Sequence, residues 1–290
     1  MKKSVSIGVH PWLGNQQRKI PEGVCVINLD HRTDRWKLFE EAWNKAMPGQ
    51  EVHRISGVPG NSLPGFGEPP LFRKGKRDRN WAGKAGCTLS HRKAIAFAKE
   101  QGWEAVLILE DDLHLPGDFG ETLLTIEAFL ATRPWSVFYA GYTDPVTPFR
   151  EVGPLSEGVT AFEIHGCNTG HAYLLHQSTF DWILNRLPTE KNIWAWVAIH
   201  KVSDRWYRKN LSRAFQVLAP ETSLVQQRGG YSDITLEKVP PHEERHITSI
   251  NPGKLCPRIY PLKKILRRGC GAVGRIRDEI RGRIRLVTGF

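Results

Sequence analysis

Ala105-Val106-Leu107-Ile108-Leu109 is a run of five apolar residues, and Glu110-Asp111-Asp112 follows it directly. Such a run predicts a strand that is buried on both faces, as in a mostly parallel sheet. In open α/β sheets, ligands bind beyond the carboxyl ends of the strands. Adjacent carboxylates repel one another, so a cation, a basic partner or water must compensate them. A hard divalent ion is the natural candidate, which favours an enzyme that handles a phosphate-bearing substrate.

Strands and helices alternate on both sides of this stretch. A strand is predicted over 24–29, and Asp30 or Thr33 is a candidate N-cap for the helix that follows. A helix over about 88–101 precedes the acidic strand. The other predicted elements are a helix over 121–131, strands over 135–140 and 172–175, a helix over 180–187, and an apolar, aromatic stretch over 193–207. This alternation predicts an α/β protein.

The segment 57–86 is rich in glycine, proline and charged residues. Its prolines exclude long regular elements there (Pro59, Pro64, Pro69 and Pro70). A loop of this length in a compact domain is usually functional or disordered.

Positive charge is concentrated at the end of the chain. The formal net charge is +11, and 254–290 contains eleven Lys and Arg against two acids, so the preceding part is nearly neutral. Apolar residues of this tail share one helical face, and arginines occupy most of the others (Val273, Ile276, Ile280, Ile284 and Val287 on the apolar face). We therefore expect a domain over 1–253 and a basic amphipathic extension over 254–290.

Three interpretations of this tail stay open. It lies on an anionic membrane surface; it binds nucleic acid through phosphates; or it is a solvated extension. The apolar residues at helical spacing favour a membrane over nucleic acid, which is not an expected partner.

The cysteines and the apolar segments bear on location. The chain has five cysteines, an odd number, with no Cys-x-x-Cys spacing, which supports neither a disulfide scaffold nor a zinc ribbon. The start of the chain lacks an apolar signal-peptide region, and no run of 18 apolar residues occurs. We expect a cytoplasmic protein that the basic tail is able to hold at the inner face of the membrane.

Several short motifs occur in the order found in one known family. They are Val26–Asp30 with Arg32 and Arg35, Gly86-Cys87-Thr88-Leu89-Ser90-His91, Leu109–Asp112, the stretches 135–141 and 169–175, Asp204, and Gln227 with Ser232-Asp233-Ile234. Together they resemble glycosyltransferase family 25, the lipopolysaccharide-type β-glycosyltransferases, which include collagen galactosyltransferases. The resemblance covers residues 24–234. Lys84 stands where the family often has an acid, and His31 stands where a basic residue is frequent.

The resemblance implies a GT-A type fold, in which helices flank a Rossmann-like, mostly parallel sheet. It implies inverting transfer of a hexose from a UDP-sugar, with galactose as the first candidate, to a hydroxyl of a surface-glycan or lipopolysaccharide-type acceptor. It also implies a divalent cofactor, Mn²⁺ first and Mg²⁺ second. The alternative is a non-catalytic, nucleotide-binding or membrane-associated basic module.

The acidic motif supplies the metal candidates. Asp112 is the candidate direct ligand, and Glu110 is a candidate for contact with a metal-bound water or with the donor ribose. Asp111 is a candidate for metal or donor contact. The alternative is that Asp111 or Asp112 only caps the next helix or ends the strand.

Inversion in one displacement requires a base that takes the proton of the attacking hydroxyl. Asp204 is the first candidate, because aromatic residues around it are able to line an acceptor pocket. The alternative is a salt bridge from Asp204 to Arg205 or Arg208. Asp233 is the second candidate base.

The remaining candidates contact the donor. Arg32 and Arg35 follow the first strand, where guanidinium groups bind phosphate through paired hydrogen bonds; otherwise they lie on a solvated helix face. Asn28 is a candidate contact for uracil or a turn residue. Ser90 and His91 are placed near a helix N-terminus, which favours an anion, or they cap and pack.

Overall fold

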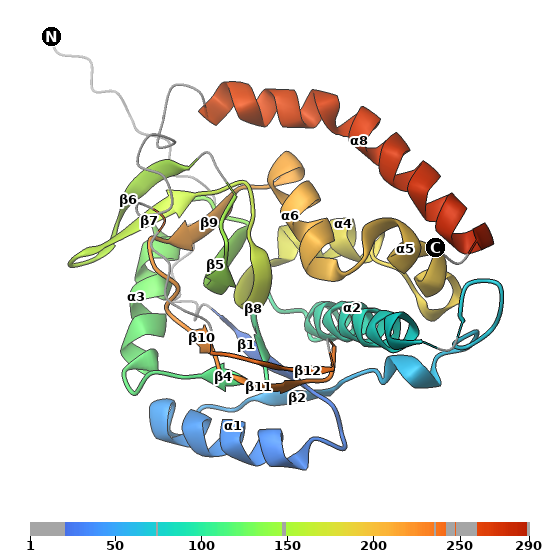
Figure 1. The fold of residues 1–290 in the computed structure, drawn as a ribbon. Helices are drawn as coiled ribbons and strands as arrows, with labels where there is room; N and C mark the ends of the chain where they lie inside the picture. Colours follow the sequence, from blue (N-terminus) through green and yellow to red (C-terminus); the bar gives the residue numbers. More distant parts are fainter. Residues whose placement is uncertain are drawn as a thin grey trace, which may run out of the picture.

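A computed structural model describes residues 21–73, 75–146, 149–234, 236–241, 247 and 260–288, without the side chains of Lys76 and 260–273. An eight-stranded sheet forms its centre (Figure 1). In spatial order the strands are β2 (His53–Ser56), β1 (Gly23–Asn28), β3 (Ala105–Glu110), β8 (Asn168–His176), β5 (Val137–Thr143), β9 (Val217–Pro220), β7 (Val159–Glu163) and β6 (Arg150–Ser156).

Strands β8 and β7 run against the other strands of this sheet. Strand β1 pairs in parallel with β2 and β3, and β5 pairs in parallel with β9, while the pairs made by β8 and β7 are antiparallel. Residues 105–109 are at most 2% exposed and lie between β1 and β8, which confirms the buried strand. The α/β class with a Rossmann-like central sheet is confirmed; the GT-A assignment stays a prediction.

Helices cover both faces of the sheet. Helices α1 (Thr33–Ala46) and α3 (Phe119–Ala131) pack on one face. The other face carries α2 (Lys76–Glu100), α4 (Phe180–Leu184), α5 (Ile193–His200) and α6 (Ser203–Ala214), with single 3-10 turns at Gly60–Ser62, Gln177–Thr179 and Glu190–Asn192. Because strand side chains alternate, Leu107 and Leu109 join the first core, and Val106 and Ile108 join the second.

Two helix starts differ from the sequence-based expectation. Helix α1 has Arg32 at its N-cap, so neither Asp30 nor Thr33 caps it. Helix α2 begins twelve residues before the expected position near residue 88. The loop predicted over 57–86 is therefore wrong from residue 76 onward. The last proline of the segment is Pro70, so no proline prevents a helix after it, and the Asp78 carboxylate caps the N-terminus of α2. It accepts hydrogen bonds from the backbone N–H groups of Gly75 (3.3 Å) and Arg73 (2.6 Å).

The glycines of α2 permit close packing. A Cβ on Gly83 would lie 2.7 Å from the Cα of Ile234, and one on Gly86 would lie 2.2 Å from the carbonyl oxygen of Val58. Two other chain segments thus approach the middle of α2 more closely than a side chain would allow.

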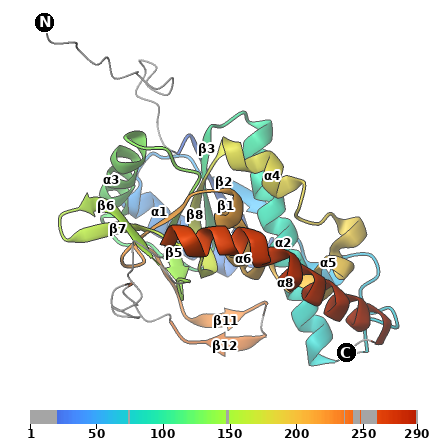
Figure 2. The same cartoon turned by 90° about the horizontal axis from the view of Figure 1, so that it is seen from above.

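Two small sheets lie near the carboxyl end of β3. Strand β4 (Leu113–His114) pairs with β10 (Gln226–Gln227), and β11 (Gly230–Ser232) forms a hairpin with β12 (Glu237–Val239), seen at the edge of the molecule in Figure 2. Neither these strands nor β6 and β7 are predicted by the sequence patterns. Strand β10 brings Gln227 to the acidic motif, and β11 brings Tyr231 to Arg35, the partner of these acids.

The C-terminal helix α8 (Tyr260–Thr288) confirms a helix in the tail and crosses over α5 and α6 (Figures 1 and 2). Lys209 pairs with Asp278, and Arg285 donates a 2.5 Å hydrogen bond to the Ala198 carbonyl. The division at residue 253 stays a prediction, because 248–259 lie outside the described residues. Among the described helices, none has the length and apolar character that a membrane span requires.

Candidate functional site

Glu110 ends β3, and Asp111 and Asp112 form the turn into β4. The next helix, α3, begins only at Phe119. The alternative in which Asp111 or Asp112 caps that helix is therefore wrong. Their carboxyl groups lie at the end of a buried central strand and are partly exposed.

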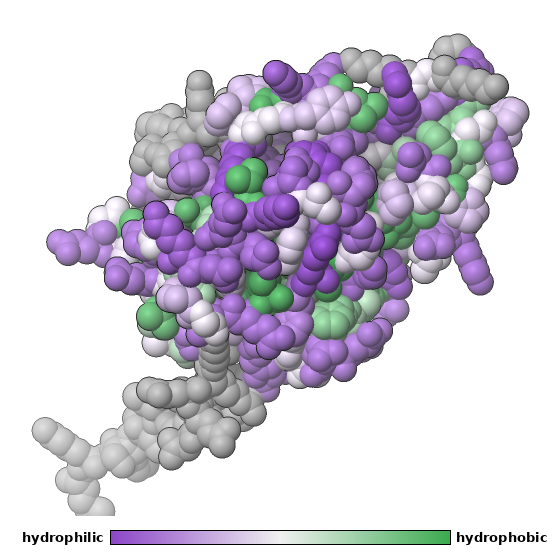
Figure 3. All heavy atoms as spheres, turned by 90° about the horizontal axis from the view of Figure 1, so that it is seen from below, coloured by the Kyte–Doolittle hydropathy of each residue, from purple (hydrophilic) through white to green (hydrophobic). Residues whose placement is uncertain are grey.

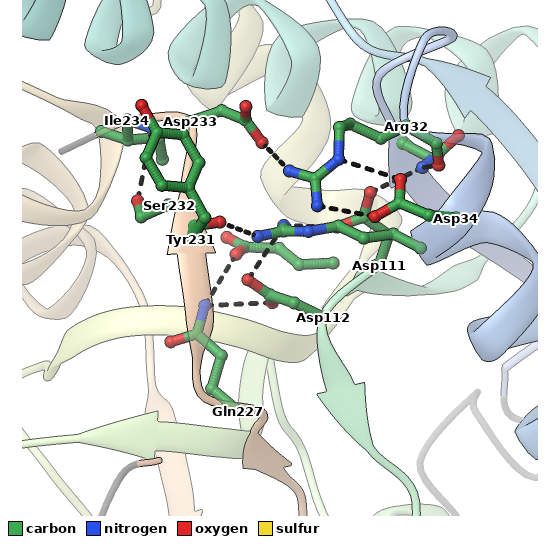
Figure 4. Close-up of polar contacts among 12 residues, drawn as sticks. Arg32, Asp34, Asp111, Asp112, Gln227, Tyr231, Ser232, Asp233 and Ile234 are labelled. Carbon is green, nitrogen blue, oxygen red and sulfur yellow. Dashed lines mark hydrogen bonds and ion pairs between the residues drawn. The ribbon is translucent and has the colours of Figure 1, made fainter. Parts of the chain in front are cut away.

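Arg35 is the basic partner of these acids. Its Nη1 lies 3.1 Å from Asp111 Oδ1 and 3.2 Å from Asp112 Oδ2, and its Nη2 donates a 2.5 Å hydrogen bond to the Tyr231 carbonyl (Figure 4). The alternative of a solvated helix face is wrong for Arg35, because its side chain is only 17% exposed. One guanidinium thus contacts two carboxylates and the β11–β12 hairpin.

Asn28 positions Asp111. Its Nδ2 donates a 2.6 Å hydrogen bond to Asp111 Oδ2 and a 3.2 Å bond to the Arg32 carbonyl, while its Oδ1 accepts bonds from Arg54 at 2.5 and 3.0 Å. The amide is 1% exposed and its groups are engaged within the protein. This arrangement disfavours the predicted contact with uracil.

Gln227 joins the acids from the opposite side. Its Nε2 donates hydrogen bonds to Glu110 Oε2 at 3.2 Å and to Asp112 Oδ1 at 3.1 Å (Figure 4). In the sequence, Gln227 is only one part of the C-terminal motif, and no role is predicted for it. The sequence indicates this contact only weakly, because Gln227 and Glu110 are 117 positions apart.

Arg32 points away from the three acids and pairs with two others. Its guanidinium bonds to Asp34 at 2.9 Å and to Asp233 in the hairpin (Figure 4). The hydrogen bond from Arg32 lowers the pKa of Asp34 to about 2. Because Asp233 is paired with the Arg32 guanidinium, it is a less suitable candidate than Asp204 for the catalytic base.

His91 and Ser90 lie in the middle of α2, so their expected position near a helix N-terminus is wrong. His91 Nδ1 is 2.8 Å from the Tyr173 hydroxyl, and Nε2 is 3.3 Å from Glu110 Oε1. Burial lowers the pKa of His91, which favours the neutral ring. Ser90 is structural: its hydroxyl donates to the Gly86 carbonyl (2.7 Å) and accepts from Val58 N–H (2.8 Å).

The carboxyl group of Asp204 has no hydrogen bond or ion pair with any residue that the structure describes. The predicted alternative of a salt bridge is thus not found, and Arg208 donates instead to Asn168 at 2.7 Å. Burial, and then the negative charge of Glu110, raise the pKa of Asp204 to about 6. A partly buried, unpaired carboxyl group with this pKa is suited to accept a proton near neutral pH.

The donor atoms of the site fit a hard divalent cation. Burial and the charges of Asp112 and Asp111 raise the pKa of Glu110 well above its usual range. Arg35 pairs with two of the three carboxyl groups, and carboxylate oxygens are the ligands that Mg²⁺ and Mn²⁺ prefer. Cys87 and His91 also lie near Glu110, but burial raises the pKa of the Cys87 thiol, which disfavours a thiolate ligand.

Comparisons with known proteins bear on this site. Residues 22–140 match the family model of glycosyltransferase family 25 (LPS biosynthesis protein). This match supports glycosyltransferase activity of the lipopolysaccharide-biosynthesis type. It includes the acidic motif, Arg32 and Arg35, and it ends before Asp204, Gln227 and Asp233. No curated protein matches the chain. Among solved structures, "Crystal Structure of A197 from STIV" is similar at 10% identity and a TM-score of 0.37, over 76% of this chain and 93% of that chain.

Proposed function

We propose, from the match of residues 22–140 to glycosyltransferase family 25, that this protein transfers a hexose from a UDP-sugar to a hydroxyl of a surface-glycan or lipopolysaccharide-type acceptor. Galactose is the proposed sugar, and the transfer is proposed to be metal-dependent and inverting. The observation that carries the proposal is the cluster of Glu110, Asp111 and Asp112 around Arg35 at the end of β3.

The acids would hold the cofactor. Asp112 would bind it directly, Glu110 would bind it directly or through water, and Asp111 would be kept in place by Asn28. When bound, a divalent ion neutralises the charge that develops on the departing diphosphate. Mn²⁺ and Mg²⁺ both suit oxygen ligands.

Arg35 and Arg32 would bind the donor diphosphate. A cation on Asp111 and Asp112 competes with Arg35 for the same oxygens. A guanidinium released in this way lies beside the metal, where it is able to donate paired hydrogen bonds to phosphate. Arg32 is tied to Asp34 and Asp233, so its contact with phosphate requires an exchange of partners.

Asp204 would act as the base. Its carboxylate would take the proton of the acceptor hydroxyl during the attack on the sugar. His91 contacts Glu110, and both groups influence the protonation of Asp204, which links the proposed base to the metal-binding acids.

Binding of UDP should depend on the metal. With Mn²⁺ and with UDP at about 100 times its dissociation constant, the free energy of unfolding should rise by ~2.7 kcal/mol. Thermal unfolding with UDP alone, Mn²⁺ alone and both together measures this effect. A panel of nucleotide sugars followed by mass spectrometry of the products then tests transfer. Equal stabilisation by UDP with and without Mn²⁺ would contradict the proposed site. Metal-dependent binding of UDP without any transfer product would favour the non-catalytic module.

Helix α8 would place the enzyme on an anionic membrane. One side of the helix packs on α5 and α6, and the described part of the predicted apolar face, from Ile276 to Val287, is exposed to solvent. Ile276, Ile280 and Ile284 are 54–58% exposed, and Val287 is 74% exposed. Exposed arginines flank this stripe (Arg275, Arg277, Arg281 and Arg283). On the opposite face of the molecule, hydrophilic residues cover most of the surface (Figure 3).

Removing this stripe should abolish membrane binding. Wild-type protein should sediment with vesicles that contain anionic lipid, since each basic residue near such a surface contributes about 1 kcal/mol. The double variant Ile280→Asp/Ile284→Asp should remain in the supernatant. Leu124→Asp is the matched control, because Leu124 is an exposed residue of α3, outside the stripe. Equal sedimentation of the double variant and the wild type would contradict membrane binding by α8.

A further inference from the structure

The stripe of α2 that faces the site carries a lysine that the proposed mechanism does not use. Asn80, Lys84, Cys87 and His91 follow one another at helical spacing on one face of α2. Asn80 donates a 3.0 Å hydrogen bond to the Ile234 carbonyl in the hairpin, and His91 contacts Glu110 at the other end. Lys84 therefore lies between the β11–β12 hairpin and the acidic cluster.

The first turn of α6 lies against this stripe. The backbone N–H of Ser203 donates to Thr88 Oγ1 at 3.1 Å, and Thr88 in turn donates to the Lys84 carbonyl at 2.9 Å. Ser203 Oγ also lies 3.8 Å from Cys87 Sγ. These contacts bring Arg205, the residue after Asp204, close to Lys84.

Lys201 completes a group of three cations. It ends α5, and its Nζ lies 5.8 Å from the ring centre of Trp81, one turn before Lys84 on α2. Burial and the neighbouring positive charges of Arg285, Lys84, Arg205 and Arg77 lower the pKa of Lys201 to about 8, and burial and Arg205 lower that of Lys84.

Within the described residues, Lys84, Lys201 and Arg205 have no ion pair with an acid. Lys84 and Lys201 are half-buried. Half-buried cations that repel one another carry a cost in free energy that an anionic ligand would offset. The two other cations near Lys201 are already engaged, since Arg77 pairs with Asp78 and Arg285 donates to the Ala198 carbonyl.

We infer that Lys84, Lys201 and Arg205 form a binding site for a negatively charged group of the acceptor, either a carboxylate or a phosphate. This inference rests on the proposed function. The site is assigned to the acceptor because Arg205 adjoins Asp204, the proposed base, whereas the donor phosphates are proposed to lie by Arg35, which pairs with Asp111 and Asp112. The buried ring of Trp81 lies beneath Lys201.

The test uses the full chain saturated with Mn²⁺ and UDP, so that the donor side is occupied. Glucose 6-phosphate, glucuronate and uncharged glucose are titrated separately by calorimetry. At least one of the two anions should bind about tenfold or more tightly than glucose, because a hydrogen bond to a charged group contributes about 1.5–3 kcal/mol and 1.4 kcal/mol is tenfold. The anion that binds more tightly identifies the ligand group as phosphate or carboxylate.

Two variants should weaken anion binding about tenfold or more and leave the affinity for UDP within about twofold. They are Lys84→Ala and Lys201→Gly; the second also relieves the left-handed backbone of Lys201, at φ 79°, so it should not unfold the protein. Lys37→Ala, which removes an exposed lysine of α1, is the matched control and should change neither affinity.

Equal affinity for the three probes would overturn the inference, as would an equal loss in the Lys37→Ala control. Weakened UDP binding in the Lys84→Ala and Lys201→Gly variants would indicate that these cations bind the donor, and this result would also overturn the inference. Failure of the wild type to bind UDP with Mn²⁺ would instead contradict the proposed function. The same three titrations without UDP would then still decide whether the cations bind an anion.

Discussion

Replacing Asp204 by asparagine should lower the rate of sugar transfer by about 10²–10⁴-fold, the usual contribution of a general base. The same variant should be more stable than the wild type at pH 7. Both effects have one cause: the Asp204 carboxyl group is partly buried, unpaired among the described residues and close to the charge of Glu110, and these features raise its pKa to about 6.

The direction of the stability effect follows from this pKa. An aspartate in the unfolded chain has a pKa near 3.8, so the ionised form of Asp204 is disfavoured in the folded state. Its cost is absent below about pH 4, grows between pH 4 and 6, and is fully present above pH 6. Asparagine removes a cost of about 1–3 kcal/mol at pH 7 and almost none at pH 4.

The measurements are transfer rates across pH and denaturant unfolding at pH 4 and pH 7. The wild-type rate should fall below about pH 6 as Asp204 takes up a proton. Glu157→Gln is the matched control, because Glu157 is an exposed acid in the β6–β7 turn and should affect neither rate nor stability. A fall of less than tenfold in the Asp204→Asn rate would exclude Asp204 as the base.

Replacing Asp112 by asparagine should abolish metal-dependent transfer and weaken Mn²⁺ binding by about 100-fold or more. The melting temperature should change by only a few degrees, since asparagine keeps one oxygen for the hydrogen bond from Gln227 or from Arg35. Loss of a negative charge beside Glu110 and Asp111 also reduces repulsion within the cluster.

Calorimetric titration with Mn²⁺, an activity assay and thermal unfolding together test this variant. Asp118→Asn is the control, because Asp118 is an exposed acid outside the acidic motif whose side chain makes no capping bond to α3. If Asp112→Asn keeps wild-type turnover and Mn²⁺ affinity, the acids would be compensated by Arg35 alone and would not hold the metal.

The parts of the fold that could be predicted are those whose sequence has a local pattern of apolar residues. The apolar run of β3, the strand β1 and the periodic helix α3 all lie close to their expected positions. The prediction places the start of α2 too late, because the prolines of the segment 57–86 and its richness in glycine and charge indicate a loop. In the fold, Gly83 and Gly86 serve close approaches by distant segments, which only the tertiary structure reveals.

The candidate site was predicted in its residue types but not in its pairings. The acids at the end of β3 were expected, and so was a compensating group. Arg35 supplies this compensation by contacting Asp111 and Asp112, which follow it by 76 and 77 positions in the sequence. Gln227 contacts Asp112 across a separation of 115 positions. Such pairings are set by how the helices and small sheets pack, which no local pattern encodes.

Arg35 bonds both to the carboxylates of Asp111 and Asp112 and to the backbone of the β11–β12 hairpin. If the acids bind a cation as proposed, its binding would be linked thermodynamically to the conformation of the hairpin through Arg35. By reciprocity, any ligand that shifts the equilibrium of one shifts the other by the same free energy.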